Sequence, residues 1–242
     1  MHRILTARVT LTVLVALIAF CLGSNAAEKQ LELAYTWSVE ASYPDFESEP
    51  VDKVVREWLE KHIEALMDDA KGMASADPDF PEGSLSLVVS AESINASDKY
   101  GSVLFHTFIS PSGAAHPMSY IEILNLDFET GRVLTFDDLF ENPDKAIAII
   151  GERAPALIKE YLEETYAHGF PGGIDDDVFF SDGMKPTREN FEAVSLQPDG
   201  IQVHFQLYQV VPYAFGMPVI TLPLDQLRPA GPNPDIWPTK TN

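Results

Sequence analysis

The pattern of apolar and polar positions predicts one strand and one amphipathic helix in the first third of the chain. Residues 31–39 alternate between apolar and polar side chains, as a half-buried strand requires. Ser48 is available as the cap of the helix that follows, Pro50 is tolerated in its first turn, and Gly72 is expected near its end. Apolar side chains recur at helical spacing at Val51, Val54, Val55, Trp58, Leu59, Ile63 and Leu66.

The middle of the chain has the pattern of an antiparallel meander. Strand-like runs occupy residues 85–95, 101–110 and 118–128, and short turns separate them. Residues 129–131, Glu-Thr-Gly, are a hairpin signal that returns the chain through residues 132–134.

A helix and an irregular segment are predicted next. Asn142 and Pro143 start the helix, Pro155 is expected to divide it into two stretches, and Gly169 can end it. Residues 170–190 are rich in Gly and Asp, which indicates an exposed excursion.

The last strands are predicted at residues 191–196, 201–208 and 219–222, with Pro-Asp-Gly turn chemistry between the first two. Strands grouped around separate helices, without regular alternation, are typical of an α+β protein. We therefore expect a mainly antiparallel sheet packed with two or three helices.

The first 26 residues have the pattern of a secretory signal peptide. Arg3 and Arg8 supply the positive end, residues 9–22 are almost wholly apolar, and residues 24–26, Ser-Asn-Ala, suit a signal peptidase. The apolar run is shorter than the roughly 20 residues of a spanning helix. Cleavage is therefore favoured over a membrane anchor, and we expect a periplasmic or secreted protein with no stable transmembrane segment after cleavage.

Cys21 is the only cysteine of the chain. A lipoprotein attached at Cys21 is a further reading, weakened by bulky Phe20 where a small residue is expected. Cleavage would leave a chain with neither a disulfide nor a thiol nucleophile, so its stability would have to come from a hydrophobic core.

The chain is strongly acidic, with a formal net charge of −21 that becomes −23 if residues 1–26, which contain two arginines and no acidic residue, are removed. Such a charge argues against partners rich in phosphate, namely nucleic acids and anionic membranes. It permits a cationic partner, whose approach long-range attraction would accelerate. The simpler interpretation is that excess acid keeps an exported protein soluble.

Two segments carry a family resemblance: residues 203–216, Val-His-Phe-Gln-Leu-Tyr-Gln-Val-Val-Pro-Tyr-Ala-Phe-Gly, and residues 113–117, Gly-Ala-Ala-His-Pro. They resemble the signature of the RsiV-like C-terminal domain family, which includes a lysozyme-sensing anti-sigma factor. Tyr43 and Pro44, followed by the predicted helix, are similar to the PdaC-like half that often precedes this domain. The resemblance implies an extracytoplasmic mixed α/β domain. It implies no deacetylase activity, since in that relative the chemistry lies in a separate metal-dependent domain.

The resemblance also implies a domain organisation. Residues 1–26 are a signal peptide and residues 27–242 the extracytoplasmic domain. Within it, residues 27–100 form the PdaC-like half, residues 101–230 the RsiV-like half, and residues 231–242 a polar tail.

His116 is the most tempting catalytic candidate, because a loop imidazole titrating near neutrality can shuttle protons. The sequence supplies no nucleophile beside it, so a turn fixed by His116 and Pro117 is the favoured interpretation. His106 and His204 could join His116 as metal ligands, but histidines so scattered seldom meet. We expect no catalytic residue, metal or cofactor.

Two other groups are candidate binding residues. Asp175, Asp176 and Asp177 offer hard oxygen ligands for calcium, yet their spacing does not match the helix-loop-helix calcium pattern, so a solvated acidic loop is favoured. The aromatic group could form a surface for a partner or glycan, or the corner where a strand leaves the sheet and fills the core, which is favoured. It consists of Tyr208, Tyr213 and Phe215.

The leading hypothesis is a non-catalytic binding or sensing module of the bacterial envelope, with a cationic protein such as lysozyme or a cell-wall component as its partner. One alternative is an envelope glycan hydrolase that uses His116. The other is a structural envelope protein with broad contacts.

Overall fold

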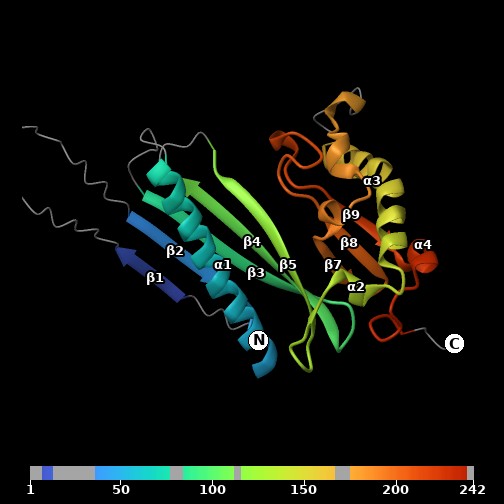
Figure 1. Cartoon of the computed structure of the whole chain (residues 1–242), viewed down its shortest axis with the longest axis horizontal. Coiled ribbons are helices and arrows are strands. Elements are labelled where there is room, and N and C mark those ends of the chain that lie inside the picture. The colour runs from blue at the N-terminus through green and yellow to red at the C-terminus, as the bar shows by residue number, and fades with distance from the viewer. Residues whose placement is uncertain (1–6, 13–35, 77–83, 112–115, 167–174, 239–242) are drawn as a thin grey trace, which may run out of the picture.

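The computed structural model describes residues 7–12, 36–76, 84–111, 116–166 and 175–238, and it confirms the predicted α+β class. Strands form two sheets, of six and three strands, and helices pack on both (Figure 1). Within the described ranges, no helix is long and apolar enough to cross a membrane.

The larger sheet has the order β1-β2-β3-β4-β5-β6. Its β3-β4-β5 core is the predicted antiparallel meander, and β2 joins β3 in parallel through α1. The elements of this part are β1 (Ala7–Thr12), β2 (Thr36–Ser42), α1 (Glu49–Ala76), β3 (Ser84–Asn95), β4 (Tyr100–Pro111), β5 (Met118–Asp127) and β6 (Val133–Leu134).

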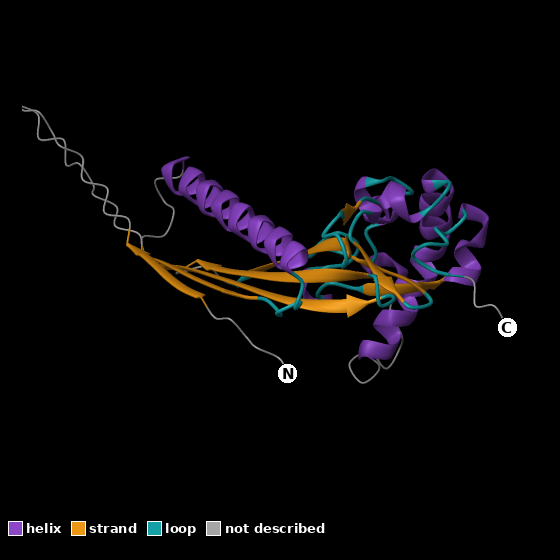
Figure 2. Cartoon of the chain, turned by 90° about the horizontal axis from the view of Figure 1, so that it is seen from below, coloured by secondary structure: helices purple, strands orange, loops and turns teal. Residues whose placement is uncertain are grey.

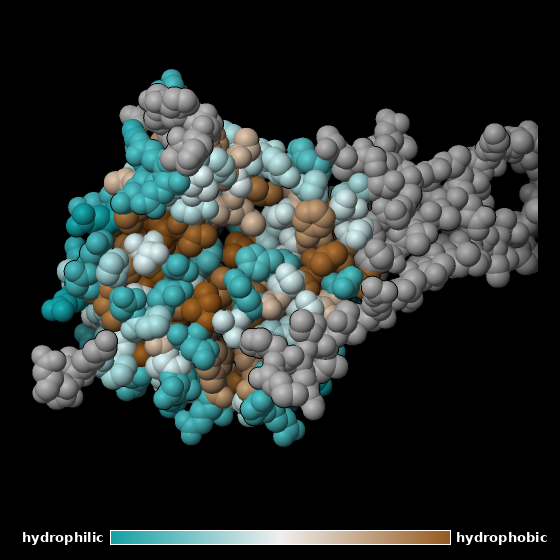
Figure 3. All heavy atoms as spheres, turned by 180° about the vertical axis from the view of Figure 1, so that it is seen from behind, coloured by the Kyte–Doolittle hydropathy of each residue, from teal (hydrophilic) through white to brown (hydrophobic). Residues whose placement is uncertain are grey.

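Helix α1 covers one face of this sheet, as the edge-on view shows (Figure 2). Its apolar stripe buries Val51, Val55 and Leu59 against alternate residues of the strands, such as Val103 and Phe105. Over β2–β4 the opposite face has no comparable helix among the described elements. Figure 3 shows apolar and polar side chains interspersed on that side of the molecule.

Two predictions about α1 are wrong. Gly72 does not end the helix, which runs to Ala76, because one glycine inside a helix costs only about 1 kcal/mol. Ser48 does not cap it with its side chain either. Its hydroxyl donates instead to the carbonyl of Phe128 (3.1 Å), which ties the start of α1 to the end of β5.

The smaller sheet has the order β7-β8-β9, all antiparallel, and α3 packs against it. The predicted strand at residues 191–196 begins later, and the strand predicted to reach residue 208 ends at His204. The elements are α2 (Phe136–Leu139), α3 (Pro143–Tyr166), η1 (Asp176–Val178), η2 (Ser181–Met184), η3 (Glu189–Phe191), β7 (Val194–Gln197), β8 (Gly200–His204), η4 (Tyr213–Phe215), β9 (Val219–Pro223), α4 (Leu224–Leu227) and η5 (Arg228–Ala230).

The prediction that Pro155 divides α3 is wrong, since the helix is continuous through it. A proline inside a helix removes one hydrogen bond and costs about 3 kcal/mol. Ile150, Ala154 and Ile158 are all fully buried on one face across this point. Their burial on both sides of the proline offsets the lost bond and keeps the two stretches in line.

The C-terminal part is more tightly packed than its composition indicates. In the predicted excursion, Phe179 and Met184 pack against the core, and residues 170–174 lie outside the described residues. The predicted polar tail also packs as far as it is described. Trp237 is 7% exposed, stacks on Phe140 and donates its indole N–H to the carbonyl of Gln197 (2.8 Å).

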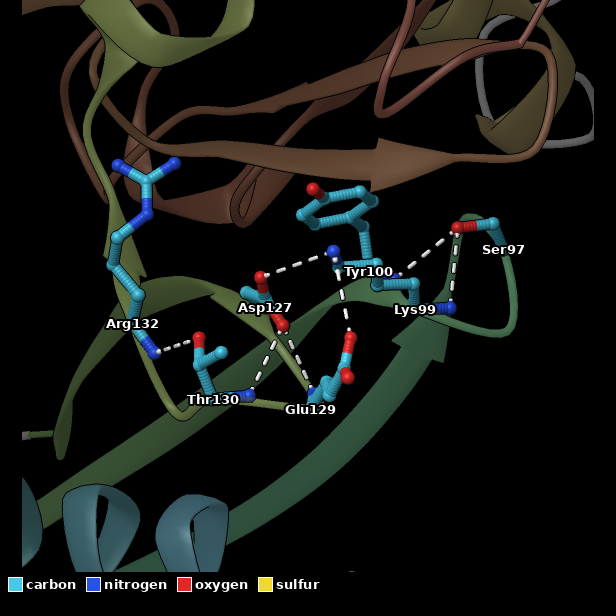
Figure 4. A network of polar contacts seen from close by, with 7 residues as sticks. All are labelled: Ser97, Lys99, Tyr100, Asp127, Glu129, Thr130 and Arg132. Carbon is cyan, nitrogen blue, oxygen red and sulfur yellow. Dashed lines mark hydrogen bonds and ion pairs between the residues drawn. The ribbon is translucent and has the colours of Figure 1, made fainter.

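Two neighbouring turns, of the β3–β4 and β5–β6 hairpins, are joined at one end of the larger sheet (Figure 4). The Asp127 carboxylate accepts from the backbone N–H groups of Glu129 (2.9 Å) and Thr130 (3.1 Å), which fixes the predicted hairpin turn. Lys99 lies 3.8 Å from that carboxylate, and its carbonyl accepts from the N–H of Phe128 (2.7 Å).

Side chains of the larger sheet bind the free edge of the smaller one. Asn125 Nδ2 donates to the carbonyl of Val194 (2.9 Å), and the N–H of Leu196 donates to Ser102 Oγ (2.7 Å). The Ser102 hydroxyl in turn donates to Asn125 Oδ1 (2.7 Å). Both side chains are buried, so these bonds satisfy main-chain groups of β7 that water does not reach.

Strand β1 lies within the predicted signal peptide. It pairs with β2 along its whole length, from Ala7 opposite Ala41 to Thr12 opposite Thr36. Cleavage after residue 26 would remove β1 and leave β2 as the outer strand. The remaining residues of the predicted signal, 1–6 and 13–26, lie outside the described residues, and cleavage stays a prediction. The implied division at residue 100 lies within the β3–β4 hairpin, whose pairing runs from Leu85 opposite Pro111 to Asn95 opposite Gly101.

We predict that Asn125→Ala lowers the free energy of unfolding by about 1–3 kcal/mol, because it leaves buried partners without hydrogen bonds. Urea denaturation followed by circular dichroism measures this. Asn95→Ala is the matched control, since Asn95 is exposed at the end of β3, and we expect a change within about 0.5 kcal/mol. Equal effects of the two variants would contradict the role of Asn125 at the junction of the sheets.

Candidate functional site

The outer edge of β5 is the floor of the candidate site. In an antiparallel pair, main-chain groups point alternately toward the partner strand and away from it. The main-chain N–H and carbonyl of Ile121 point away from β4. The N–H donates to Gln206 Oε1 (3.1 Å), and the carbonyl accepts from Gln206 Nε2 (2.6 Å). The side-chain amide of Gln206 therefore acts as a one-residue strand partner.

By the same alternation, the main-chain N–H and carbonyl groups of Ile123 and Asn125 also point away from β4. Asn125 is paired with Leu134 of β6, whose pairing with β5 covers only Asn125 and Leu126. Ile123 lies between Ile121, whose main chain is bonded to Gln206, and Asn125, which is paired with β6. Among the described residues, none hydrogen-bonds to its outward N–H or carbonyl.

Two hollows meet at Ile123 and Glu192, one of about 560 Å³ and one of about 340 Å³. Together they form a groove between the edge of β5 and the segment 188–193, and we call this the β5 groove. Its acidic residues are Asp137, Glu122, Glu189 and Glu192, its amides are Asn125, Asn190, Gln206 and Gln209, and its larger apolar side chains are Trp58, Ile121, Ile123, Leu134 and Phe136.

Several polar groups of the groove are held in place by contacts within the protein. Arg188 lies 2.7 Å from an Asp137 oxygen and over the ring of Phe136 (5.1 Å). Gln209 donates to the carbonyl of Asn190 (2.9 Å) and accepts from the N–H of Gln206 (2.9 Å). These bonds fix the wall of the groove opposite β5.

Glu122 has an ion-pair partner beneath the groove. His62 Nε2, on α1, lies 2.7 Å from Glu122 Oε2 and 3.2 Å from Thr107 Oγ1. Although the first distance is short, no donor among the described residues reaches the buried Oε2 with hydrogen-bond geometry. His62 also stacks on Trp58 (4.7 Å between centroids), which rests on Phe105 (3.9 Å), so Trp58 is fixed between two rings.

Three of the predicted site residues form an aromatic cluster outside the groove. The rings of His116 and Tyr213 lie 4.3 Å apart, and those of Tyr208 and Tyr213 lie 5.7 Å apart. The Tyr213 hydroxyl donates to the carbonyl of Pro117 (3.1 Å), which joins the η4 corner to the start of β5. Residues 113–115 of the resemblance motif lie outside the described residues.

The other predicted residues lie elsewhere. Phe215 is in the core against Tyr166, so the predicted core corner describes Phe215 but not Tyr208, which is 52% exposed in a left-handed conformation (φ 63°). Asp175 and Asp177 are exposed at η1, and the side chain of Asp176 lies outside the described part of the structure. No contact between this loop and the aromatic cluster is found in the described parts.

His204 is not a surface ligand but a buried residue, 4% exposed. Its Nε2 lies 2.8 Å from Ser195 Oγ, and its buried Nδ1 has no hydrogen-bond partner in the described part of the chain. Burial, with a smaller contribution from nearby His106, lowers the pKa of His204 from 6.5 to about 4. In the described ranges, no three His, Cys, Asp or Glu side chains group as a metal ion would require.

Sequence patterns missed the residues that build the β5 groove. Gln206 lies inside the aromatic motif of residues 203–216, and it belongs to no spacing pattern that would mark it as a strand partner. Ile123 looks like an ordinary apolar position of a strand. The one available signal is the shortness of the run at residues 132–134, which cannot cover all of β5.

Residues 137–225 match the family described as "Protein of unknown function (DUF3298)". The matched residues make up less than half of the chain. Over 178 residues, 72% of the chain, the sequence is also 24% identical to the peptidoglycan-N-acetylmuramic acid deacetylase PdaC of Bacillus subtilis strain 168. The match spans 35% of that protein's length. The PdaC-like part of the resemblance is thus supported, and its RsiV-like part is not.

Two crystal structures of DUF3298 family proteins share the fold of nearly the whole chain. One, from Pseudomonas aeruginosa PAO1, has a TM-score of 0.54 at 15% identity and covers 98% of both chains. The other, from Bacteroides fragilis NCTC 9343, has a TM-score of 0.52 at 17% identity and covers 97% of this chain and 96% of its own. At these identities the likeness shows the fold alone.

Stability should depend on pH through His204. Because its folded pKa of about 4 lies below the unfolded value near 6.5, folding favours the neutral ring. The stabilisation is full above about pH 6.5 and is lost as the pH falls toward 4, by on the order of 3 kcal/mol at most. We predict that His204→Gln flattens the curve of unfolding free energy against pH between about pH 4 and 6.5. His116→Gln, at an exposed position, should leave this curve unchanged. Parallel curves for wild type and His204→Gln would refute the assignment.

Substitutions of the aromatic residues should differ in their effects on the free energy of unfolding. Phe215→Ala is expected to lower the free energy of unfolding by about 3–5 kcal/mol, since it empties a core position. Tyr208→Ala should change it by less than about 0.5 kcal/mol, because the side chain is exposed. Chemical denaturation of both variants measures this, and a large loss for Tyr208→Ala would place that ring in the core.

Proposed function

We propose that this chain is a non-catalytic binding module of the bacterial envelope that recognises a cell-wall component through the β5 groove. The observation that carries the proposal is the match of 72% of the chain to a protein named as acting on peptidoglycan. Because the match spans only 35% of that protein, its deacetylase activity is not transferred to this chain.

The chemistry of the β5 groove supports binding of a polar, uncharged ligand. Carboxylates accept hydrogen bonds from hydroxyl groups, and the main chain of Ile123 offers one further donor and one acceptor. The size of the two hollows, about 560 and 340 Å³, is that of sites for small ligands.

The surroundings of His116 do not favour the hydrolase alternative. Its Nδ1 lies 3.3 Å from the carbonyl of Pro117, and its ring packs on Tyr213. A general base needs a substrate position and usually an orienting partner. Neither contact supplies one, so we do not propose catalysis by His116.

An exported location is part of the proposal. It is supported by the signal-peptide pattern of residues 1–26 and by a relative whose named substrate is part of the cell wall.

A cationic protein such as lysozyme is the second candidate partner. The formal net charge of −21 favours it, since such a charge attracts a basic protein over long distances. This attraction weakens with salt, because the Debye length shortens to about 8 Å at physiological ionic strength.

Co-sedimentation with purified peptidoglycan sacculi tests the leading proposal. We expect the full chain to sediment with sacculi in both low and moderate salt, since salt does little to screen hydrogen bonds from the groove to an uncharged ligand. The double variant Glu189→Ala, Glu192→Ala should bind at least threefold more weakly, because it removes hydroxyl acceptors. The control Glu163→Ala, Glu164→Ala removes the same charge from exposed positions of α3.

Titration against lysozyme at the same two salt concentrations separates the candidates. Binding to lysozyme alone, lost at moderate salt, would replace the cell-wall partner by a cationic protein. Absence of binding to both sacculi and lysozyme would refute the binding module as proposed.

A further inference from the structure

A tight turn beside the β5 groove carries a strained tyrosine. The N–H of Gln209 donates to the carbonyl of Gln206 (3.1 Å), which closes a β-turn over residues 206–209. Tyr208, the third residue of this turn, has a φ of 63°. Turns with a positive φ at that position favour glycine or asparagine, because the Cβ of a larger residue crowds the backbone. A tyrosine at this position therefore costs free energy in the folded state.

Both ends of this turn are fixed by bonds within the β5 groove. The side-chain amide of Gln206 bonds to the N–H and the carbonyl of Ile121, and Gln209 donates to the carbonyl of Asn190 (2.9 Å). Both glutamines line the smaller hollow. A strained conformation persists where the surrounding bonds leave the chain no alternative. Tyr208 is thus held at the tip of a turn whose two ends belong to the groove.

The side chain of Tyr208 contributes little packing that would offset this cost. It is 52% exposed, the largest fraction among the exposed large hydrophobic residues of the described ranges. Its ring contacts that of Tyr213 at 5.7 Å with a tilt of 39°, and Tyr213 is itself held by the bond from its hydroxyl to the carbonyl of Pro117. A bulky ring that stays exposed in a strained conformation indicates a role other than stability.

The surroundings of Tyr208 favour a sugar ring as its contact. One exposed ring is far smaller than the roughly 800 Å² that each partner contributes to a stable protein interface. The face of an aromatic ring carries partial negative charge, so it attracts the slightly positive C–H groups on the flat side of a sugar. The hydroxyl groups of the same ligand can donate to Glu189 and Glu192, which line the neighbouring hollow.

An extended peptide is less suited to this place. A peptide that adds to a strand edge bonds to alternate residues of that strand in succession. Gln206 already bonds to both main-chain groups of Ile121, so such pairing along β5 is interrupted next to the turn. A sugar needs no continuous strand edge, because its contacts are a ring face and separate hydroxyl groups.

We propose that Tyr208 is a stacking platform for a sugar ring of the cell-wall glycan beside the β5 groove. This inference rests on the proposed function and adds a contact outside the residues that line the two hollows. The exposed face of Tyr208 packs on the C–H face of one sugar, while Glu189 and Glu192 accept from hydroxyl groups of the glycan in the groove. Tyr213 supports the platform from the side.

Three substitutions of Tyr208 separate the strain from the ring. Phenylalanine keeps the ring and the strain, alanine keeps the strain without the ring, and glycine removes both. In urea denaturation of the full chain, Tyr208→Gly should have a higher midpoint than Tyr208→Ala, because glycine adopts a positive φ without a crowded Cβ. An equal or lower midpoint would show that the turn is not strained at Tyr208, and the argument for the platform would fail.

Binding of the same variants to purified peptidoglycan sacculi tests the platform. In co-sedimentation at moderate salt, Tyr208→Ala and Tyr208→Gly should bind about fivefold more weakly than wild type, because both lack the ring. Tyr208→Phe should stay within about twofold of wild type, since it keeps the ring face. Phe108→Ala is the matched control and should bind as wild type does, because Phe108 is also exposed (42%) but does not line the groove.

Soluble fragments identify the group that contacts Tyr208. The probes are glycan strands freed of their stem peptides and, separately, the released stem peptides, each followed by proton NMR as the full chain is added. The C–H resonances of the sugar rings should shift upfield with wild type, since protons above an aromatic face are shielded, and this shift should be lost with Tyr208→Ala. A shift that depends on Tyr208 in the peptides, with none in the glycan, would overturn the proposal.

Failure of this inference can be told apart from failure of the proposed function. If wild type and all three Tyr208 variants bind sacculi equally, the platform is refuted and the binding module stands. If wild type does not bind sacculi, the proposed function and this inference fall together. Weaker binding of Tyr208→Ala to lysozyme, with sacculus binding unchanged, would assign the ring to a cationic group of a protein partner and refute the sugar platform.

Discussion

Each sheet uses side chains to close the exposed edge of the other, and the arrangement of the two halves depends on this exchange. Ser102 and Asn125, from the larger sheet, bond to Val194 and Leu196 on the edge of β7. Gln206, which follows β8, bonds to Ile121 on the edge of β5. Main-chain groups at a buried edge must find partners, and here the partners are side chains instead of further strands.

This exchange explains why the candidate site lies where it does. A side chain can hydrogen-bond to the main-chain groups of one residue on a strand edge, whereas a neighbouring strand bonds to those of several residues. Gln206 and the two-residue strand β6 therefore leave Ile123 uncovered between them. The segment 188–193, held by Arg188 and Gln209, forms the opposite wall and turns the uncovered position into a groove.

The fold was largely predictable because its signals are local. The helix with apolar residues from Val51 to Leu66 and the meander of residues 85–128 each follow a single period, and both are present. Predictions failed where packing outweighed a local preference. Pro155 stays within α3 because the same helix face is buried on both sides of it. Trp237 is buried although it lies in the segment predicted to be a polar tail.

By itself the sequence determined the α+β class, the main helix, the antiparallel meander of residues 85–128 and the acidic charge, since each follows from periodicity or composition. The β5 groove was decided only by the tertiary structure. It depends on which main-chain groups of β5 remain unpaired, and that is set by the position of Gln206, 85 residues away from Ile121 in the chain. The periodicity of apolar side chains indicates which face of a sheet a residue occupies, but it does not indicate whether the main-chain groups of that residue are hydrogen-bonded.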